Sequence, residues 1–116
     1  MCNVFLSKEF NKSNHKRHVI FICDHASNKI PKQYNNLGLT KPNINSHIAY
    51  DIGAKKITVA LTKTLQQSYF ISNFSRLLID LNRDIKDNDL IVSNSFGVDV
   101  PGNNKISKYE KEKRIS

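Results

Sequence analysis

A short and almost unbroken apolar run, HVIFIC at residues 18–23, sets the fold class of this chain. Its β-branched and aromatic residues are typical of a strand buried on both faces of a sheet. A second run of this kind, SYFISN, follows at residues 68–73, and between the two an apolar residue recurs every three or four positions, which predicts a helix. The helical positions are Ile52, Ala54, Ile57, Ala60, Leu61 and Leu65, with Asp51 at the expected N-cap. Strand, helix and strand in this order predict an α/β fold with parallel pairing.

The rest of the chain is less regular. Residues 1–17 are expected to form a loose lead-in, and residues 18–116 a domain. The segment RLLIDLN, at residues 76–82, is interpreted as a further strand after a turn. Residues 83–104 are loop-like, and the tail KISKYEKEKRIS predicts the first turns of a polar helix.

Composition points to a small core. Apolar residues make up 39% of the 116 residues, below the usual range of about 45–50%. With a mean hydropathy of -0.47, this indicates either a thin core or a core completed by something outside this chain. Two cysteines cannot build a disulfide framework, and neither a secretory signal nor a membrane-spanning run is recognisable, so we expect a cytoplasmic protein.

The net charge of +8 allows a different class of function, a small basic module that binds nucleic acid or an acidic partner. The lysines are scattered, however, and aromatic residues do not alternate with them as in a stacking platform for bases. Positive charge suits an anionic small substrate equally well. A nucleic-acid partner is therefore the less favoured interpretation, and a steep salt dependence of binding would support it.

The first candidate site lies where the first strand ends, at Asp24 and His25. Ligands of open α/β sheets bind outside the carboxyl ends of the strands. His25 could bind a metal there, with its second ring nitrogen oriented by a carboxylate such as Asp24. The alternative is a histidine that is merely hydrogen-bonded within a loop. The adjacent Cys23 is interpreted as a small buried residue.

Two further clusters leave alternatives open. His47 and Asp51 are four residues apart and would share one face of a helix, either as a metal pair or as a surface histidine beside a helix cap. In a strand, Arg76, Asp80 and Asn82 would share one face. Paired arginines near an amide suit bidentate binding of a carboxylate, whereas a structural ion pair of Asp80 with Arg76 or Arg83 is the alternative.

Four stretches together resemble the N-formylglutamate amidohydrolase family, which is grouped with zinc carboxypeptidases and aspartoacylase-like deacylases. They are VIFICDHASNKIP, HIAYDIGA, NFSRLLIDLNR and VPGNNKIS, in the order of the family and covering most of residues 18–107. The resemblance implies a mixed, largely parallel sheet flanked by helices, of the phosphorylase/hydrolase-like kind. It also implies hydrolysis of an N-formyl amino acid to formate and glutamate, with zinc as cofactor.

The resemblance also implies roles for individual residues. His25 would be a zinc ligand, and Asp51 is the candidate second ligand, because Asn28 stands where deacylase relatives have a glutamate ligand. Arg76 would polarise the scissile carbonyl. Asn82 and Arg83 would hold the carboxylate of the small-molecule substrate.

Members of this family are considerably longer, and their later part carries another metal-binding histidine. No histidine follows His47 in this sequence. A catalytic zinc needs about three protein ligands. We therefore expect residues 18–116 to be the N-terminal half of a truncated amidohydrolase domain, inactive alone, with the other half as a possible separate partner chain.

Overall fold

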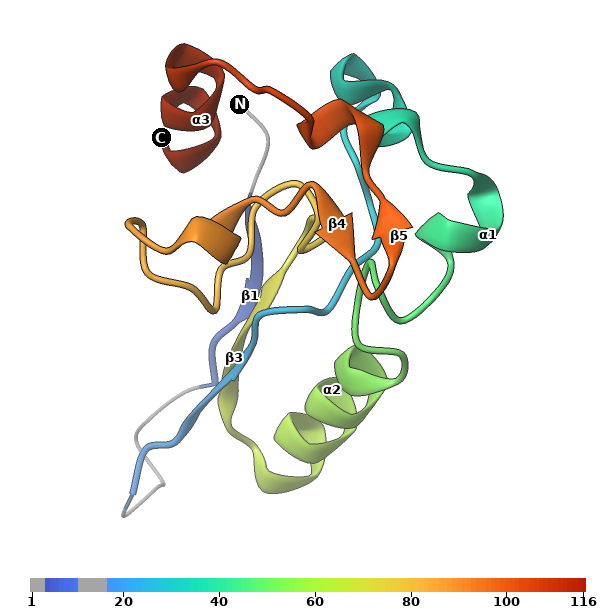
Figure 1. The fold of residues 1–116 in the computed structure, drawn as a ribbon. Coiled ribbons are helices and arrows are strands. Elements are labelled where there is room, and N and C mark those ends of the chain that lie inside the picture. The colour runs from blue at the N-terminus through green and yellow to red at the C-terminus, as the bar shows by residue number, and fades with distance from the viewer. Residues whose placement is uncertain (1–3, 11–16) are drawn as a thin grey trace.

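The computed structural model describes residues 4–10 and 17–116, and a three-stranded sheet runs through its centre (Figure 1). The strands β1 (Phe5–Lys8), β2 (Ile20–Cys23) and β3 (Ser68–Ser72) lie in the order β1-β3-β2. β2 is parallel to β3, whereas β1 is antiparallel to it, so the sheet is mixed. The strands expected at residues 18–23 and 68–73, and their parallel pairing, are confirmed.

The expectation of a loose lead-in is wrong for Phe5–Lys8, which form β1. All four residues are exposed, so the segment lacks the alternation of buried and exposed positions that marks a strand in a sequence. It is ordered instead by pairing with β3, from Phe5 opposite Ser72 to Lys8 opposite Tyr69. The remainder of the predicted lead-in at residues 1–3 and 11–16 lies outside the described residues.

The helix predicted between the two strands is α2 (Ala54–Leu65), and it begins later than expected. Its N-cap is Gly53, in a left-handed conformation with a φ of 89°, and the cap makes no side-chain hydrogen bond. The prediction of Asp51 as N-cap is therefore wrong. The carbonyl of Asp51 accepts a hydrogen bond from Ala54 N, while its carboxylate is turned toward His25. Glycine suits the N-cap because a side chain is unfavourable at this φ.

The apolar stripe of α2 does not face the sheet. Ala54 packs near the buried pair Cys23 and Ile71, and Thr62 is almost fully buried. Thr62 can be buried because its hydroxyl donates to the Thr58 carbonyl, at 2.9 Å. The stripe residues Ile57, Leu61 and Leu65 are exposed, and so are Ile20 and Ile22 of β2. The expectation that β2 is buried on both faces is thus wrong within this chain.

The segment predicted as a strand at residues 76–82 forms consecutive turns instead. Backbone groups of this segment and of the preceding residue bind to distant parts of the chain. Ser75 N donates to Lys29 O at 2.8 Å, and Asp80 N donates to Leu90 O at 2.9 Å. The buried Ser75 hydroxyl donates to Ala49 O at 2.7 Å. These scattered partners replace the regular ladder that a strand requires.

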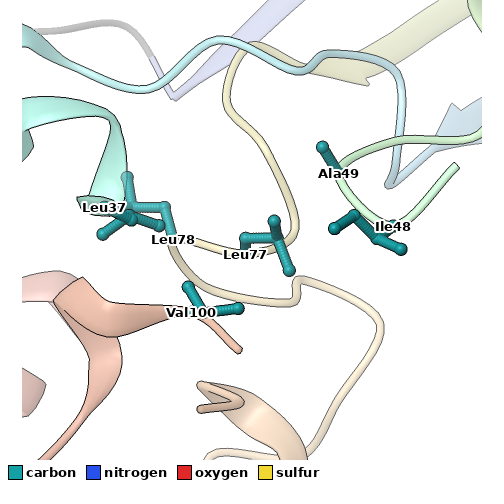
Figure 2. Close-up of a cluster of buried hydrophobic side chains, with 6 residues drawn as sticks. All are labelled: Leu37, Ile48, Ala49, Leu77, Leu78 and Val100. Carbon is teal, nitrogen blue, oxygen red and sulfur yellow. The ribbon is translucent and has the colours of Figure 1, made fainter. Parts of the chain in front are cut away.

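The larger of two hydrophobic clusters is built from turns and loops (Figure 2). Its buried members are Leu37, Ile48, Ala49, Leu77, Leu78 and Val100. They come from the 3₁₀ segment η2 (Lys32–Gly38), from two turns, and from the residue before η4 (Pro101–Asn103). Because no strand or helix period connects these positions, the sequence pattern did not predict this cluster.

The remaining elements are short. They are α1 (Lys41–Ile44), η3 (Asn88–Leu90), the hairpin strands β4 (Asn94–Ser95) and β5 (Val98–Asp99), and α3 (Lys108–Ile115). α3 confirms the predicted polar helix, and Ser107 caps it by accepting from Glu110 N at 3.0 Å. Its Arg114 donates to Asn103 Oδ1 at 2.7 Å. Within residues 4–10 and 17–116, no helix is both long and apolar enough to span a bilayer.

Gly102→Ala is expected to lower the free energy of unfolding by about 1–3 kcal/mol, as overpacking typically does. A Cβ at Gly102 would lie 2.6 Å from Leu37 Cα, which is backbone and cannot rotate away. Chemical denaturation would measure the change. The neighbouring exposed substitution Asn104→Ala, as a control, should stay within about 0.5 kcal/mol; equal effects of the two would contradict the close approach.

Candidate active site

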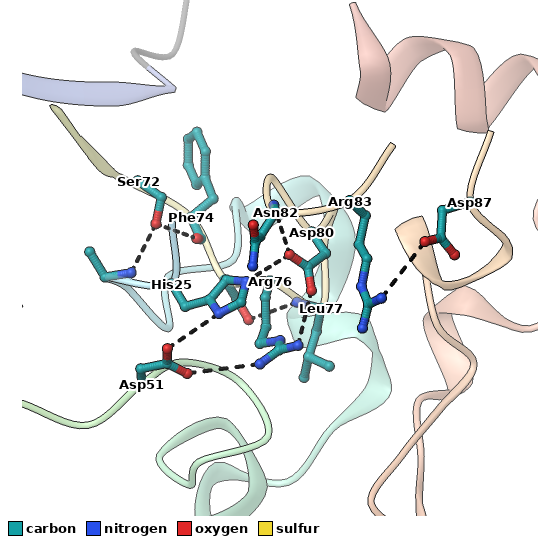
Figure 3. A network of polar contacts seen from close by, with 12 residues as sticks. His25, Asp51, Ser72, Phe74, Arg76, Leu77, Asp80, Asn82, Arg83 and Asp87 are labelled. Carbon is teal, nitrogen blue, oxygen red and sulfur yellow. Dashed lines mark hydrogen bonds and ion pairs between the residues drawn. The ribbon is translucent and has the colours of Figure 1, made fainter. Parts of the chain in front are cut away.

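His25 lies directly after β2 and is buried between two carboxylates (Figure 3). Its Nε2 is 2.6 Å from Asp80 Oδ1, and its Nδ1 is 3.3 Å from Asp51 Oδ2. The carbonyl of His25 also accepts from Asp51 N at 2.9 Å, which fixes the two segments side by side. The expected orienting carboxylate, Asp24, is therefore replaced by Asp80, which comes from a turn 55 residues later.

Asp80 is the most enclosed charged group of the site. Its Oδ2 accepts from Arg76 Nη2 at 3.0 Å and its Oδ1 from the backbone N of Asn82 at 3.0 Å. Burial alone would raise the pKa of the Asp80 carboxyl, but the hydrogen bonds from His25 and Asn82 and the charges of His25 and Arg76 outweigh it and hold the pKa below its ordinary value. Asp80 is therefore ionised at neutral pH.

Arg76 bridges the two carboxylates that flank the histidine. It lies 3.0 Å from Asp80 and 3.8 Å from Asp51, and its side chain is 23% exposed. The structural ion pair considered for Asp80 is thus present with Arg76, whereas Arg83 pairs with Asp87 at 3.7 Å. Arg76 keeps part of its guanidinium accessible, so a structural and a catalytic role are compatible.

An open cavity of about 210 Å³ connects the two arginines. It is lined by Arg76, Asp80, Arg83, Asp89, Val92, Asn94, Ser95 and Phe96. The structure therefore places Arg76 and Arg83 at one surface hollow, next to the carboxylate that holds His25. The backbone N–H of Asn82 donates a hydrogen bond to Asp80 Oδ1 and so helps to hold that carboxylate in the site. Phe96 was not anticipated from the sequence, since it lies at the turn of the β4–β5 hairpin.

Two residues near the site, His47 and Asn28, have partners other than His25 and Asp51. His47 and Asp51 do not share a helix face, because residues 46–50 form turns; the His47 ring instead packs edge-to-face on Phe96, with centroids 5.2 Å apart. Asn28 directs its amide away from His25. It donates to Ile44 O at 3.1 Å and to Asn45 Oδ1 at 3.0 Å, and so fastens the end of α1.

The spacing of His25 and Asp51 would allow the two side chains to share a metal ion. Their Nδ1···Oδ2 separation of 3.3 Å exceeds the 2.7–2.9 Å of a charge-assisted hydrogen bond. It equals the separation of about 3.3 Å expected between a nitrogen and an oxygen that each lie about 2.0–2.1 Å from a tetrahedral zinc. Asp80 on the opposite nitrogen is the orienting partner that metal-binding histidines usually have. Among the residues that the structure describes, no group of three or more His, Cys, Asp or Glu could hold a metal.

The α/β fold thus brings a histidine, two carboxylates and an arginine together beyond the C-terminal end of the parallel strand β2. The family model for N-formylglutamate amidohydrolase matches residues 17–116. The chain belongs to this family.

A solved structure shares the fold of this chain. The crystal structure of gene product Atu2144 from Agrobacterium tumefaciens superposes with a TM-score of 0.87 at 30% sequence identity. The match covers 96% of this chain and 43% of that chain, so this chain spans less than half the length of the solved relative. A comparison with curated proteins finds no match.

Proposed function

We propose that this chain supplies part of the active site of a metal-dependent amidohydrolase that cleaves N-formylglutamate into formate and glutamate. The observation that carries the proposal is the buried His25, held by Asp80 on one nitrogen and near Asp51 on the other, with Arg76 paired to both carboxylates. Membership of the N-formylglutamate amidohydrolase family supports the reaction class. The complete fold that we propose is the phosphorylase/hydrolase-like one, with helices on both faces of a larger, mostly parallel sheet.

In this proposal His25 Nδ1 and the Asp51 carboxylate would hold zinc. When bound, zinc lowers the pKa of water to about 7 and so supplies hydroxide at neutral pH. Asp80 fixes the His25 ring through Nε2, and its negative charge strengthens Nδ1 as a donor. Arg76 stabilises the negative charge that develops on the formyl oxygen, since it is held in place by Asp80 before the substrate arrives.

Arg83 is proposed to bind the substrate carboxylate, together with Asn82. Its side chain is 43% exposed, and its contact with Asp87 is long at 3.7 Å, so the guanidinium can turn toward an incoming anion. A carboxylate in the cavity would meet Arg83 and Arg76 from the same side. Bidentate pairing with a guanidinium gives both affinity and orientation.

The chain by itself is proposed to be inactive. A catalytic zinc needs about three protein ligands, and His25 and Asp51 provide two. The remaining donors would come from polypeptide equivalent to the part of the Atu2144 product that this chain does not cover. Formate release from N-formylglutamate, with zinc, should therefore require both polypeptides together. Formation of a complex without any formate release would contradict the proposed function.

In the active mixture, Arg83→Ala should raise the KM for N-formylglutamate at least tenfold, because a hydrogen-bonded charge pair is typically worth about 1.5–3 kcal/mol. The KM for an N-formyl amino acid amide, which lacks the carboxylate, should change little. Lys86→Ala removes the same charge from the same exposed loop, outside the cavity lining, and serves as the matched control. Equal KM increases for both substrates would remove Arg83 from the carboxylate site.

A further inference from the structure

Two apolar strips lie at the surface, one on the sheet beside the edge strand β2 and one on α2. The sheet strip consists of Ile20, Ile22 and Phe70, which are 58%, 67% and 36% exposed. Because Ile22 is paired with Phe70 in the parallel register, their side chains point to the same face of the sheet. The helix strip consists of Ile57, Leu61 and Leu65, spaced four residues apart on α2 and 62%, 44% and 51% exposed.

The sheet strip and α2 lie on opposite faces of the sheet. Cys23 and Ile71 face α2, as their packing against Ala54 shows, so Ile22 and Phe70, one residue earlier in each strand, face the other way. Figure 1 shows α2 along one side of the sheet. β2 pairs only with β3 in the described sheet, which leaves its outer backbone groups unpaired.

An exposed apolar sheet face next to an unpaired strand edge is usually covered by another polypeptide segment. Parallel strand pairs occur almost only where both faces are buried, and exposed edges of apolar strands are pairing sites. Single exposed apolar side chains are ordinary, but here six of them form two rows, three on the open face of the sheet and three on α2. The surface therefore has the properties of an interface rather than of a solvated face.

The choice of occupant rests on the solved relative and on the proposed function. The match covers 96% of this chain but 43% of the Atu2144 product, so more than half of that longer chain has no counterpart here. A second copy of this chain is a poor occupant, because each copy carries a net charge of +8 and α2 presents Lys55, Lys56 and Lys63 beside the helix strip. We propose that the two strips dock a polypeptide equivalent to the unmatched part of the relative, which extends the sheet from β2.

The test measures binding, with the unmatched part of the Atu2144 product as a separate polypeptide. Titration calorimetry and sedimentation should give a 1:1 complex, and hydrogen exchange should show new protection of the β2 amides. Ile22→Lys and Leu61→Lys should each weaken binding at least tenfold. Both positions are exposed, so the circular dichroism and the unfolding midpoint of the free chain should not change.

Ile85→Lys is the matched control, because Ile85 is 61% exposed in a loop away from both strips. It should leave the affinity unchanged. Absence of a complex, or an equal loss of affinity with Ile85→Lys, would overturn the proposal. Self-association of the chain that Ile22→Lys abolishes would assign the strips to a second copy and overturn it as well. Because the readout is binding, failure of docking is distinguishable from failure of the proposed hydrolysis.

Discussion

Asp80→Ala is expected to lower the free energy of unfolding by about 3–5 kcal/mol, the usual cost of removing one partner of a buried ion pair. The side chain of Asp80 is 6% exposed and joins three groups: the His25 ring, the Arg76 guanidinium and the backbone N–H of Asn82. Without the carboxylate, His25 loses its 2.6 Å partner and the Arg76 charge remains half-buried. Urea denaturation followed by circular dichroism would measure the loss.

Asp51→Ala provides the comparison for this result. Asp51 contacts the same histidine and the same arginine, but its side chain is 55% exposed and its distances are 3.3 and 3.8 Å. Exposed ion pairs contribute about 0–1 kcal/mol, so this variant should remain nearly as stable as the parent. If the two substitutions cost the same, Asp80 would not be the structural centre of the site.

The elements that could be predicted from the sequence are those whose signal is local. The apolar runs at residues 18–23 and 68–73 predicted β2 and β3, and the three-to-four-residue spacing predicted α2. The segment at residues 76–82 misled because its alternation of polar and apolar residues imitates a strand. Its actual shape depends on the buried Ser75, whose partners Lys29 and Ala49 are distant in the sequence.

The sequence predicted which residues belong to the candidate site but not which of them contact one another. His25, Asp51 and Arg76 were identified, mainly through the resemblance of four stretches to one family, and the structure brings them together. That Asp80 holds the histidine could not be read from either local segment, since it requires β2 and the turns at residues 76–82 to meet. The catalytic, metal-binding and substrate-binding roles of these residues stay predictions.

The low apolar fraction of the sequence agrees with the small core seen in the structure. Composition indicated a core that is thin or completed from outside the chain, and the structure leaves apolar residues of β2 and α2 at the surface. Helix periodicity correctly predicted that Ile57, Leu61 and Leu65 share a face. It could not tell which surface that face meets, because periodicity contains no information about the partner.

His25→Ala is expected to reduce zinc affinity at least a hundredfold in the mixture of this chain with the unmatched part of the relative. The substitution removes one of the two proposed zinc donors of this chain, and the remaining one, Asp51, has a side chain that is 55% exposed. Asp80→Asn keeps the size of the side chain but removes the charge behind His25. This substitution should lower the zinc affinity about 10–100-fold, the usual effect of altering the orienting partner of a metal-binding histidine.

Competition with a chromophoric chelator would measure these affinities at fixed pH. His47→Ala is the control, since the His47 ring packs on Phe96 and has no contact with His25 or Asp51 among the described interactions. It should bind zinc as the parent does. An unchanged zinc affinity in His25→Ala would exclude this residue as a ligand, and the 3.3 Å separation from Asp51 would then be a long hydrogen bond within a purely structural network. If His25 binds zinc and the buried Asp80 orients it, the zinc affinities should form a graded series. His25→Ala should bind zinc most weakly, Asp80→Asn should bind it more tightly, and His47→Ala should bind it most tightly of the three.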